Sequence, residues 1–399
     1  MLTNPQDQLK ILKENAIDFI NDKEFINKLN EKKKLKIKLG VDPSRPDLHL
    51  GHAVVLKKLK QFQDFGHEVI LIIGDFTARI GDPSGKSKTR PMLTKEEVIE
   101  NAKSYAEQAF KIIDKDKTTL KYNGEWFDKM TFEDVLKLSS KYTVARMLER
   151  DDFNKRYTNN QPISISEFLY PIAQGYDSVM VESDVEIGGT DQLFNLLVGR
   201  KLQEEEGMKP QIVLTMPIIE GTDGNLKMSK TYDNYIAFTD KPEDMFGKVM
   251  SIPDTLIVKY MKYLTDMTSE DIRKIEELLK QPETNPRDIK MNLGMAIVSD
   301  FYTKEEAEKA KEHFINVFQK KNNPDEMPYL NILNGEIEII DLLMNNNLFE
   351  SKSEAKRMIK QGAVKINEEK ITDFRELLNL KGGEVLRIGK RKFFKILVS

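Results

Sequence analysis

The sequence predicts an α/β protein whose first part is a doubly wound parallel sheet with a helical insertion, followed by an α-helical domain and a small α+β domain. Three observations lead to this fold class. Strand, helix and buried strand patterns follow one another twice within the first 216 residues. The pattern then changes to amphipathic helices, and the net charge changes sign near the C-terminus. A length of 399 residues is sufficient for two or three domains.

Composition excludes several protein classes. Hydrophobic residues at 39% and charged residues at 32% are typical of a soluble globular chain and not of collagen-like, disordered or membrane proteins. The longest apolar runs are far below the ~18 residues of a membrane span, and the first residues lack a signal pattern, so we expect a cytoplasmic protein. With zero cysteines, disulfide scaffolds, thiolate zinc sites and cysteine nucleophiles are excluded. Two of the four histidines, His49 and His52, fall within one tetrapeptide.

The first strand–helix–strand unit begins at residue 34. Apolar and polar residues alternate from Lys34 to Asp42, which predicts a half-buried strand. A helix is expected from about His52 to Phe65, ended by Gly66. The continuously apolar run from 69 to 74 predicts a buried parallel strand. The order of these elements predicts a right-handed βαβ unit.

A second unit repeats this order. We expect a strand at Val179–Ile187, a helix at Asp191–Glu206 and a buried strand at Gln211–Met216. The two units predict a Rossmann-like open sheet that binds ligands at the carboxyl ends of its strands. A mostly helical insertion is expected between them, from about 87 to 176, and the whole domain spans 1–231.

The remainder of the chain predicts two further domains. Capping boxes at Thr268/Asp271 and Thr303/Glu306, with Asn285 before Pro286, indicate a helical domain over 232–325. A linker is expected next, and a compact α+β module over 338–399. The linker is marked by Asn322, Asn323, Pro324 and Pro328.

Charge is distributed unevenly along the chain. From residue 351 to the end, 13 Lys and Arg stand against 6 Asp and Glu, a net charge of +7. The first 350 residues have 49 against 59, a net of −10. A basic module on an acidic body suggests a polyanionic partner for that module, with a solvated basic face as the alternative.

The HLGH stretch at 49–52 lies between a strand and a helix N-terminus, where free N–H groups and the helix dipole favour phosphate. Two imidazoles there can donate hydrogen bonds to phosphoryl oxygens, and Gly51 lets a flat group such as a purine approach the backbone. A metal site is the rival interpretation. It is weak, because no third ligand has suitable spacing. A chance pair of histidines is the remaining alternative.

Two further segments invite a phosphate interpretation. The stretch from Gly81 to Ser87 has three residues between its glycines where a Walker A motif needs four, so we reject that motif. Asp82 within it could bind an ammonium group, or could be a turn residue before Pro83. KMSKT at 227–231 follows two glycines, and its lysines could close over a triphosphate. A solvated lysine loop is the alternative for KMSKT.

Taken together, HLGH after the first strand, KMSKT after the last and an insertion between the halves resemble the signature of class I aminoacyl-tRNA synthetases. The chain is further similar to tyrosyl-tRNA synthetases, with blocks in that family's order. These are DPS at 42–44, IGDPSGK at 80–86, YPIAQGYD at 170–177 and GGTDQ at 188–192. The segments 351–362 and 364–367 resemble the ribosomal S-four RNA-binding fold that ends many bacterial members. The likeness covers essentially the whole chain.

The resemblance implies a role for each matching residue. For ATP, it implies Asp42 and Ser44 near the phosphates, His49 and His52 in contact with them, Gly51 at adenine, and Gly189 and Asp191 at the ribose. For L-tyrosine, it implies Asp82, Tyr170 and Gln174 at the ammonium, Gln192 near the carbonyl, and Asp177 as acceptor for the phenol hydroxyl. Closure on pyrophosphate falls to Lys227, Lys230 and Thr231. For tRNA(Tyr), the basic module offers Lys352, Lys356, Arg357 and Lys360 on one helix.

The resemblance also implies a reaction and an assembly. ATP, accompanied by Mg²⁺, activates L-tyrosine to tyrosyl-adenylate, and the tyrosyl group then passes to the 3′ end of tRNA(Tyr). A homodimer is implied, with its interface around residues 120–170. No protein metal site and no editing domain are expected. Many relatives have a second tyrosine where this chain has Lys38, whose role is open: it could approach the substrate, pair with Asp177 or reach solvent.

The spacing of the residues implied for tyrosine is consistent with a single pocket. Tyr170, Gln174 and Asp177 are spaced i, i+4 and i+7, so they share one helix face. A buried Asp177 left unpaired by phenylalanine would discriminate strongly, which is a known example for this enzyme family. Two rival functions stay open at this point. One is a tryptophanyl-tRNA synthetase, and the other is a synthetase-derived RNA-binding protein without catalysis.

Overall fold

A computed structural model describes residues 4–32, 34–43, 47–83, 94–319, 327–332, 336–367, 369–389 and 392–398. The chain forms two compact units, 1–308 and 309–399. In the described part of the first unit, six strands form one sheet in the order β1-β6-β5-β2-β3-β4. Their bounds are β1 (Asp18–Ile20), β2 (Lys36–Val41), β3 (Glu68–Ile73), β4 (Thr118–Tyr122), β5 (Val185–Gly189) and β6 (Ile212–Met216).

The sheet is doubly wound, as predicted. All its neighbouring strands are parallel except β1, which pairs antiparallel with β6 at one edge. From β2 the chain proceeds to β3 and β4 on one side, and from β5 to β6 on the other. The strand order therefore reverses between β2 and β5, and such a switch point leaves a ligand crevice at the carboxyl ends of the two strands.

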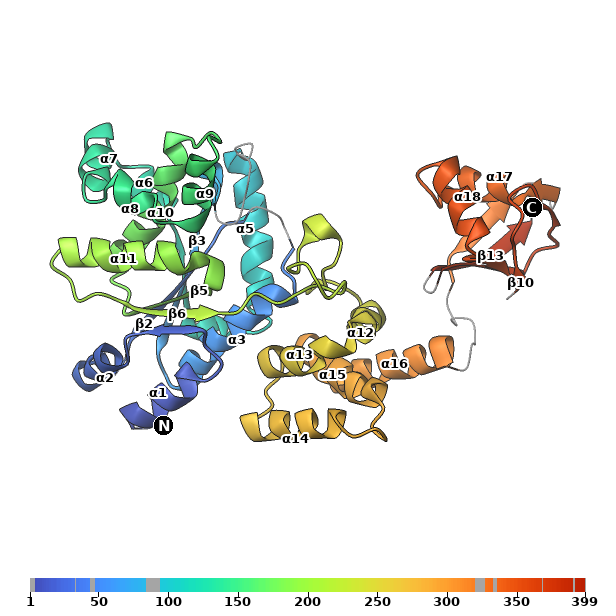
Figure 1. Cartoon of the computed structure of the whole chain (residues 1–399), viewed down its shortest axis with the longest axis horizontal. Coiled ribbons are helices and arrows are strands. Elements are labelled where there is room, and N and C mark those ends of the chain that lie inside the picture. Colours follow the sequence, from blue (N-terminus) through green and yellow to red (C-terminus); the bar gives the residue numbers. More distant parts are fainter. Residues whose placement is uncertain are drawn as a thin grey trace. The chain divides into compact units, whose positions relative to one another are not determined.

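Helices cover both faces of this sheet. Figure 1 shows α10 (Ile165–Met180) and α11 (Leu193–Glu205) on one face and α3 (Leu50–Asp64) on the other. The opposite placement follows from right-handed crossovers that run in opposite directions from the switch point. The other helices of this part are α1 (Pro5–Lys13), α2 (Asp22–Glu31), α4 (Thr77–Ile80), α5 (Lys95–Ala109), α6 (Gly124–Phe127), α7 (Phe132–Ser139), α8 (Val144–Met147) and α9 (Asp151–Thr158).

Three predictions about the sheet need correction. The predicted strand at Val179–Ile187 starts only at Val185, because α10 continues to Met180 and a turn follows. The stretch from 87 to 176 is mostly helical where it is described, but its strand β4 pairs with β3 and extends the sheet. The first predicted strand is not half-buried. It lies between β3 and β5, and both of its faces are covered.

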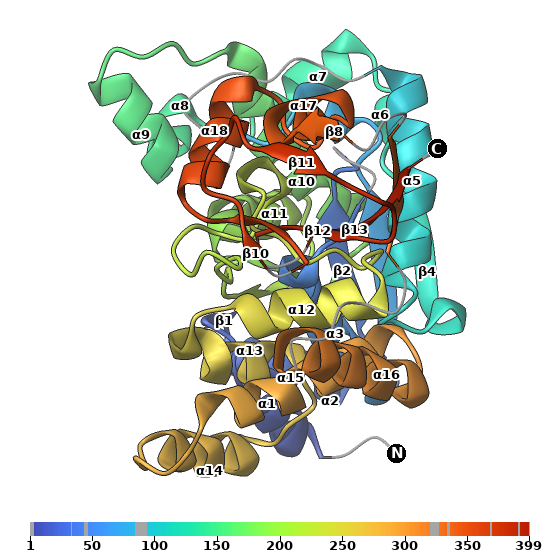
Figure 2. The same cartoon turned by 90° about the vertical axis from the view of Figure 1, so that its right-hand side faces the viewer.

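Amphipathic helices follow the sheet, as the pattern indicates. They are α12 (Pro242–Ser251), α13 (Ile257–Leu264), α14 (Ser269–Leu279), α15 (Pro286–Phe301) and α16 (Lys304–Phe314), and Figure 2 shows α12, α13 and α15 packed together. Both capping boxes are confirmed, since Thr268 and Asp271, and likewise Thr303 and Glu306, exchange hydrogen bonds. Helix α13 packs against α3, which joins these helices to the sheet. None of the described helices has the length and apolar character to cross a membrane.

The second unit is a small α+β module. Its strands form a sheet in the order β10-β9-β12-β13-β7 and a separate pair β11-β8, over a core that includes Leu342, Ile359 and Leu386. Strand β7 lies before residue 338 and β8 ends at it, and each of them pairs with a later strand. We therefore propose that this module begins before 338. Of the linker residues, Asn322, Asn323 and Pro324 lie outside the described part. The elements are β7 (Tyr329–Ile332), β8 (Glu336–Glu338), α17 (Ile339–Asn345), α18 (Lys352–Lys360), β9 (Val364–Ile366), β10 (Glu369–Lys370), β11 (Leu377–Asn379), β12 (Val385–Ile388) and β13 (Lys392–Val398).

Candidate active site

The HLGH histidines form the N-terminal cap of α3. His49 Nδ1 accepts a hydrogen bond from the Gly51 N–H (3.2 Å), and His52 Nδ1 accepts one from the His49 N–H (3.1 Å). The two ring centroids lie 4.0 Å apart. A neutral imidazole that accepts at Nδ1 must have its proton at Nε2. Both rings therefore present an Nε2–H donor beside the helix N-terminus, as phosphate binding requires.

Both histidines are neutral near pH 7. Burial chiefly, with smaller contributions from the neighbouring His52 and Lys227, lowers the pKa of His49 to about 2. Burial also lowers the pKa of His52 to about 4, against a small rise from its bond to the His49 backbone. The rings consequently act as hydrogen-bond donors and not as cations.

The KMSKT segment lies next to HLGH. The chain just after it forms a β-bridge between His49 and Ala237, and the Leu50 N–H donates to Ile236 (3.0 Å). A Cβ added at Gly51 would be 3.9 Å from the Met228 side chain, so little space separates the two motifs. The Lys230 ammonium forms an ion pair with Asp47, which is on the loop before α3. The two motifs therefore meet, although 175 or more residues separate them in sequence.

A polar chain runs from the end of β5 to α10. The Gln192 amide donates to Asp82 (2.8 Å), and the Asn195 amide donates to Gln192 (3.1 Å) and to Gln174 (2.8 Å). Gly189 and Asp191 are adjacent at the end of β5, where a Cβ on Gly189 would lie 2.8 Å from the Asp191 carboxylate. Asp82, Gln174 and Gln192 are thus brought together, as predicted.

The predicted tyrosine-binding face of α10 is buried. Tyr170, Gln174 and Asp177 all lie on this helix and are at most 8% exposed. The Tyr170 hydroxyl donates to Asp42 at the end of β2 (2.8 Å), and Asp42 also accepts from Thr77 (2.7 Å). Burial, chiefly, raises the pKa of Tyr170, so its hydroxyl keeps its proton.

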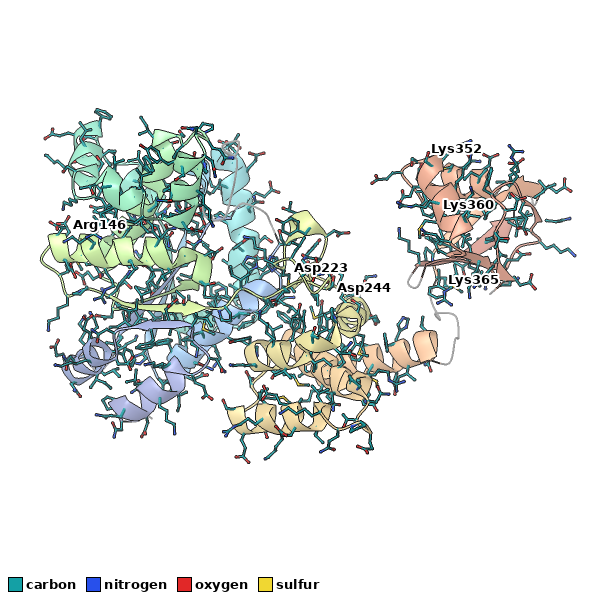
Figure 3. The ribbon with its side chains drawn as sticks, in the orientation of Figure 1. Arg146, Asp223, Asp244, Lys352, Lys360 and Lys365 are labelled. Carbon is teal, nitrogen blue, oxygen red and sulfur yellow. The ribbon has the colours of Figure 1, made fainter. Side chains whose placement is uncertain are left out.

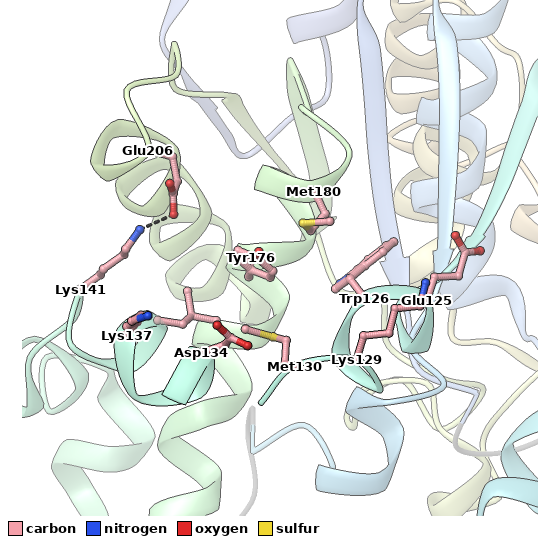
Figure 4. A pocket seen from close by; sticks show the side chains of 11 residues that line it. Glu125, Trp126, Lys129, Met130, Asp134, Lys137, Lys141, Tyr176, Met180 and Glu206 are labelled. Atoms are coloured by element: carbon pink, nitrogen blue, oxygen red, sulfur yellow. Dashed lines mark hydrogen bonds and ion pairs between the residues drawn. The ribbon is translucent and has the colours of Figure 1, made fainter. Parts of the chain in front are cut away.

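Asp177 accepts two side-chain hydrogen bonds, from Trp126 Nε1 (3.0 Å) and from Asn123 (3.3 Å). Burial outweighs the opposing effects of the Lys38 charge and these two bonds, and the pKa of Asp177 is raised to about 7. A carboxylate has about four lone-pair sites, so two remain for another donor. Trp126 also lines a cavity of about 530 Å³. Figure 4 shows it there with Met130, Tyr176 and Met180.

Lys38 neither reaches solvent nor pairs with Asp177, two of the possibilities that the sequence leaves open. It is 0% exposed, and its ammonium pairs with Glu186 (2.8 Å). It also donates to the Gln174 carbonyl (2.8 Å) and to the Ser178 hydroxyl (2.7 Å). These three bonds use all three N–H groups of the ammonium, so none is left for a substrate.

The four basic residues predicted to contact tRNA lie on α18. All four are exposed, while Ala355 and Ile359 on the same helix are buried in the core. Figure 3 shows Lys352 and Lys360 along this helix. The four are Lys352, Lys356, Arg357 and Lys360.

Sequence reasoning missed Glu186, Asn123, Trp126 and Asn195. A signal existed for two of them: Glu186 interrupts an otherwise apolar strand, and Asn195 lies one helical turn after Gln192. The partners of Asp177 come from the start of α6, more than 50 residues earlier in the chain, and nothing in their local sequence indicates this. Ser44 and residues 84–86 of IGDPSGK lie outside the described part. Within the described residues, no group of three or more His, Cys, Asp or Glu could hold a metal ion.

Comparisons with known proteins match both parts of the chain. The family described as "tRNA synthetases class I (W and Y)" matches residues 30–319, and "Tyrosine--tRNA ligase SYY-like C-terminal domain" matches 319–396. The tyrosine–tRNA ligase of Thermotoga maritima is 63% identical over 98% of each chain. That of Chlorobaculum tepidum is 54% identical over 98% of this chain and 97% of its own.

Solved structures share the fold. A tyrosyl-tRNA synthetase from Archaeoglobus fulgidus has a TM-score of 0.63 at 23% identity, covering 77% of this chain and 99% of its own. A C-terminally truncated mitochondrial tyrosyl-tRNA synthetase from Aspergillus nidulans has a TM-score of 0.64 at 23% identity, covering 78% and 94%.

The fold and the site define the class: this is a class I aminoacyl-tRNA synthetase of the group that comprises the tryptophan and tyrosine enzymes. Within that group, the chain belongs to the tyrosine–tRNA ligase family, and its activity is that of a tyrosine–tRNA ligase. The predicted fold class, family and activity are confirmed.

Proposed function

We propose that the chain activates L-tyrosine with ATP in the crevice between β2 and β5 and then transfers the tyrosyl group to tRNA(Tyr). One observation carries this proposal. The HLGH donors, the KMSKT lysine Lys230 and the polar face of α10 all lie at the carboxyl ends of the same two strands. ATP would place its phosphates at His49 and His52, with Gly51 at adenine and Gly189 and Asp191 at the ribose. Mg²⁺ would accompany the phosphates.

The tyrosine pocket would lie along α10. Asp82, Tyr170 and Gln174 would bind the ammonium group, Gln192 would lie near the carbonyl, and Asp177 would accept the phenol hydroxyl. The free lone pairs of Asp177 and its burial support the last role, because phenylalanine would leave a buried acceptor without its donor.

The first reaction needs no general base. The tyrosine carboxylate attacks the α-phosphate of ATP in line, a P–O bond forms, and pyrophosphate leaves. Catalysis would come from positioning and from donors that stabilise charge as it develops. His49, His52, Lys227, Lys230 and Thr231 are proposed for the second task. Neutral Nε2–H donors at a helix N-terminus support this for the histidines.

Pyrophosphate exchange tests the substrate. We expect ATP–pyrophosphate exchange with L-tyrosine at saturating ATP, and rates lower by about 10⁴-fold or more in kcat/KM with phenylalanine. Tryptophan should give no exchange above background. Exchange that is strongest with tryptophan, or absent with all three amino acids, would contradict the proposal.

The basic helix α18 would bind tRNA(Tyr), mainly through its phosphates. Exposed Lys360 and Arg357 support this, because phosphate contacts need unburied cations. The cytoplasmic location expected from the sequence stays a prediction.

We also propose a homodimer formed through residues 120–170. Large apolar side chains are exposed there, with Phe132 at 77% and Ile165 at 80%, and Leu136, Val144 and Tyr157 are exposed as well. Such a group of apolar residues is typical of an interaction surface. Sedimentation velocity should give a dimer of the 46.1 kDa chain, and Ile165→Asp should shift it towards monomer. An exposed Ile11→Asp variant serves as control and should stay dimeric.

A further inference from the structure

Lys38 and Glu186 form a buried ion pair below α10. They are register partners on the adjacent parallel strands β2 and β5, so both side chains leave the sheet on the same face. Both residues are 0% exposed. A buried pair of this kind is stable only when further hydrogen bonds satisfy its atoms. Here Glu186 accepts from Ser178 (2.9 Å) and from Gln211.

The pair is tied to the helix that forms the proposed tyrosine pocket. Lys38 donates to the Gln174 carbonyl and to the Ser178 hydroxyl, two positions one turn apart on α10. Asp177 lies within that turn, and the Gln174 amide itself approaches Glu186 (3.4 Å). The Lys38 ammonium therefore fixes the position of this turn of α10 relative to the sheet, and its rotation about the helix axis. The same turn includes Gln174 and Asp177.

Close packing of two helices leaves this turn little freedom. A Cβ on Gly175 would lie 3.0 Å from the Gly199 nitrogen of α11. A Cβ on Gly199 would meet Gln211 at 2.6 Å and Glu186 at 3.2 Å. Both glycines let α10 and α11 approach directly above the ion pair, so a change in the pair is transmitted to α10 and not absorbed by free space.

We propose that Lys38 and Glu186 are positioning residues that orient Gln174 and Asp177 for the phenol and ammonium groups of tyrosine, and that the Lys38 charge keeps Asp177 in its acceptor form. The inference rests on the proposed tyrosine pocket and extends it to a residue pair that touches no substrate.

The charges around Asp177 set the sign of the electrostatic effect. Lys38 on β2 lowers the pKa of Asp177, and Glu186 on β5 raises it by less. Tyr170 on the same helix stays neutral, and Asn123 and Trp126 donate to the carboxylate. Removing the Lys38 charge should thus raise the pKa of Asp177, and removing the Glu186 charge should lower it.

Opposite pH shifts test the proposal. The measurement is kcat/KM for tyrosine in pyrophosphate exchange from pH 6 to 9, which reports groups of the free enzyme. In Lys38→Met the midpoint of the pH profile, which follows the pKa of Asp177, should move up by about one unit from about 7, so that kcat/KM at pH 7 falls by about fivefold. In Glu186→Gln the midpoint should move down. We expect kcat to stay within about twofold in both, since the change lies in tyrosine binding.

A double variant distinguishes a loss of positioning from misfolding caused by an unpaired buried charge. Lys38→Met combined with Glu186→Gln leaves no unpaired buried charge. It should fold, show a smaller upward shift than Lys38→Met, and keep a raised KM because the bonds to α10 are gone. A wild-type KM and midpoint in this folded double variant would overturn the proposal, as would shifts of the two single variants in the same direction.

Two control variants distinguish positioning by Lys38 from a general loss of stability and from failure of the pocket. Lys58 is also buried and donates to three oxygens, those of Leu12, Glu14 and Gln61, away from α10. Lys58→Met should lower the melting temperature without moving the midpoint.

The second control, Asp177→Asn, tests the pocket itself. If it leaves the preference for tyrosine over phenylalanine unchanged, the proposed pocket fails. If it abolishes that preference while Lys38→Met shifts nothing, only the positioning role of Lys38 and Glu186 fails.

Discussion

At the scale of the residue, the histidines of HLGH combine two tasks in one ring. Each Nδ1 accepts a backbone N–H at the start of α3, and in the proposed site each Nε2–H would donate to a phosphate. The sequence predicts the donors from their place before a helix. It does not predict the tautomer, which depends on backbone geometry that forms only in the folded chain. Lys38 is a second example, since its partner Glu186 lies 148 residues away.

Substitutions at His52 test the capping role and the proposed phosphate-donor role. His52→Ala should lower the rate of adenylate formation by about 10²-fold, the usual loss for one transition-state donor. Tyrosine affinity should change little, because the proposed tyrosine pocket lies along α10 and does not include this ring. Stopped-flow measurement of adenylate formation and equilibrium binding of tyrosine check the two quantities.

His52→Asn serves as the structural control. Its amide oxygen can still accept the His49 N–H, so stability should be retained while adenylate formation stays slow. Buried His67, which bonds Gln8 and the Leu35 N–H, provides a further control. Changing it should affect stability and leave the rate of the folded enzyme unchanged. Equal losses of rate and tyrosine affinity in His52→Ala would contradict the assigned role.

At the scale of the element, the helices and the buried strands β3 and β6 follow local patterns closely. Capping boxes and apolar periodicity are local signals, and α14 begins where they indicate. The failures have a tertiary cause. The apolar residues Val179 and Met180 continue α10 and not a strand, and β4 joins the sheet only because β3 offers an edge. Edge pairing is a long-range event that a local pattern does not encode.

Two glycines in helices should respond with opposite signs to the same substitution. A Cβ at Gly199 of α11 would overlap the polar cluster below it, so Gly199→Ala should destabilise the protein by about 1–3 kcal/mol. Gly247 of α12 has open space around its Cβ position, so Gly247→Ala should stabilise it by about 0.5–1 kcal/mol. Urea unfolding compares the two. A loss of stability at Gly247 as large as at Gly199 would show that helix packing does not set the difference.

At the scale of the whole molecule, the charge distribution is the most useful sequence signal. The balance of −3 conceals an acidic body and a basic module of +7 from residue 351 onward. The structure places that module in a separate unit with its own core. Composition predicts that a basic module follows an acidic body. The exact start of the module depends on strands β7 and β8, which are short and weakly patterned.

Removing the C-terminal unit should separate the two reactions. A chain that ends at residue 319 retains every residue proposed for adenylate formation, so pyrophosphate exchange should persist. Charging of tRNA(Tyr) should fall strongly, and the residual charging should depend less on salt because phosphate contacts are lost. A milder variant, Arg357→Ala with Lys360→Ala, should weaken charging. The slope of log affinity for tRNA against log salt should fall by the contribution of about two phosphate contacts. Loss of exchange in the truncated chain would instead assign this unit a stabilising role.

The ion pair between Asp47 and Lys230 has a consequence for which anions the enzyme admits. Any anion that recruits Lys230 must first replace a carboxylate that already neutralises it. A single phosphate offers little more than that carboxylate, whereas a triphosphate also gains the two imidazole donors at the same moment. The pair would therefore weaken the binding of an anion that contacts Lys230 alone, relative to a ligand long enough to reach both motifs.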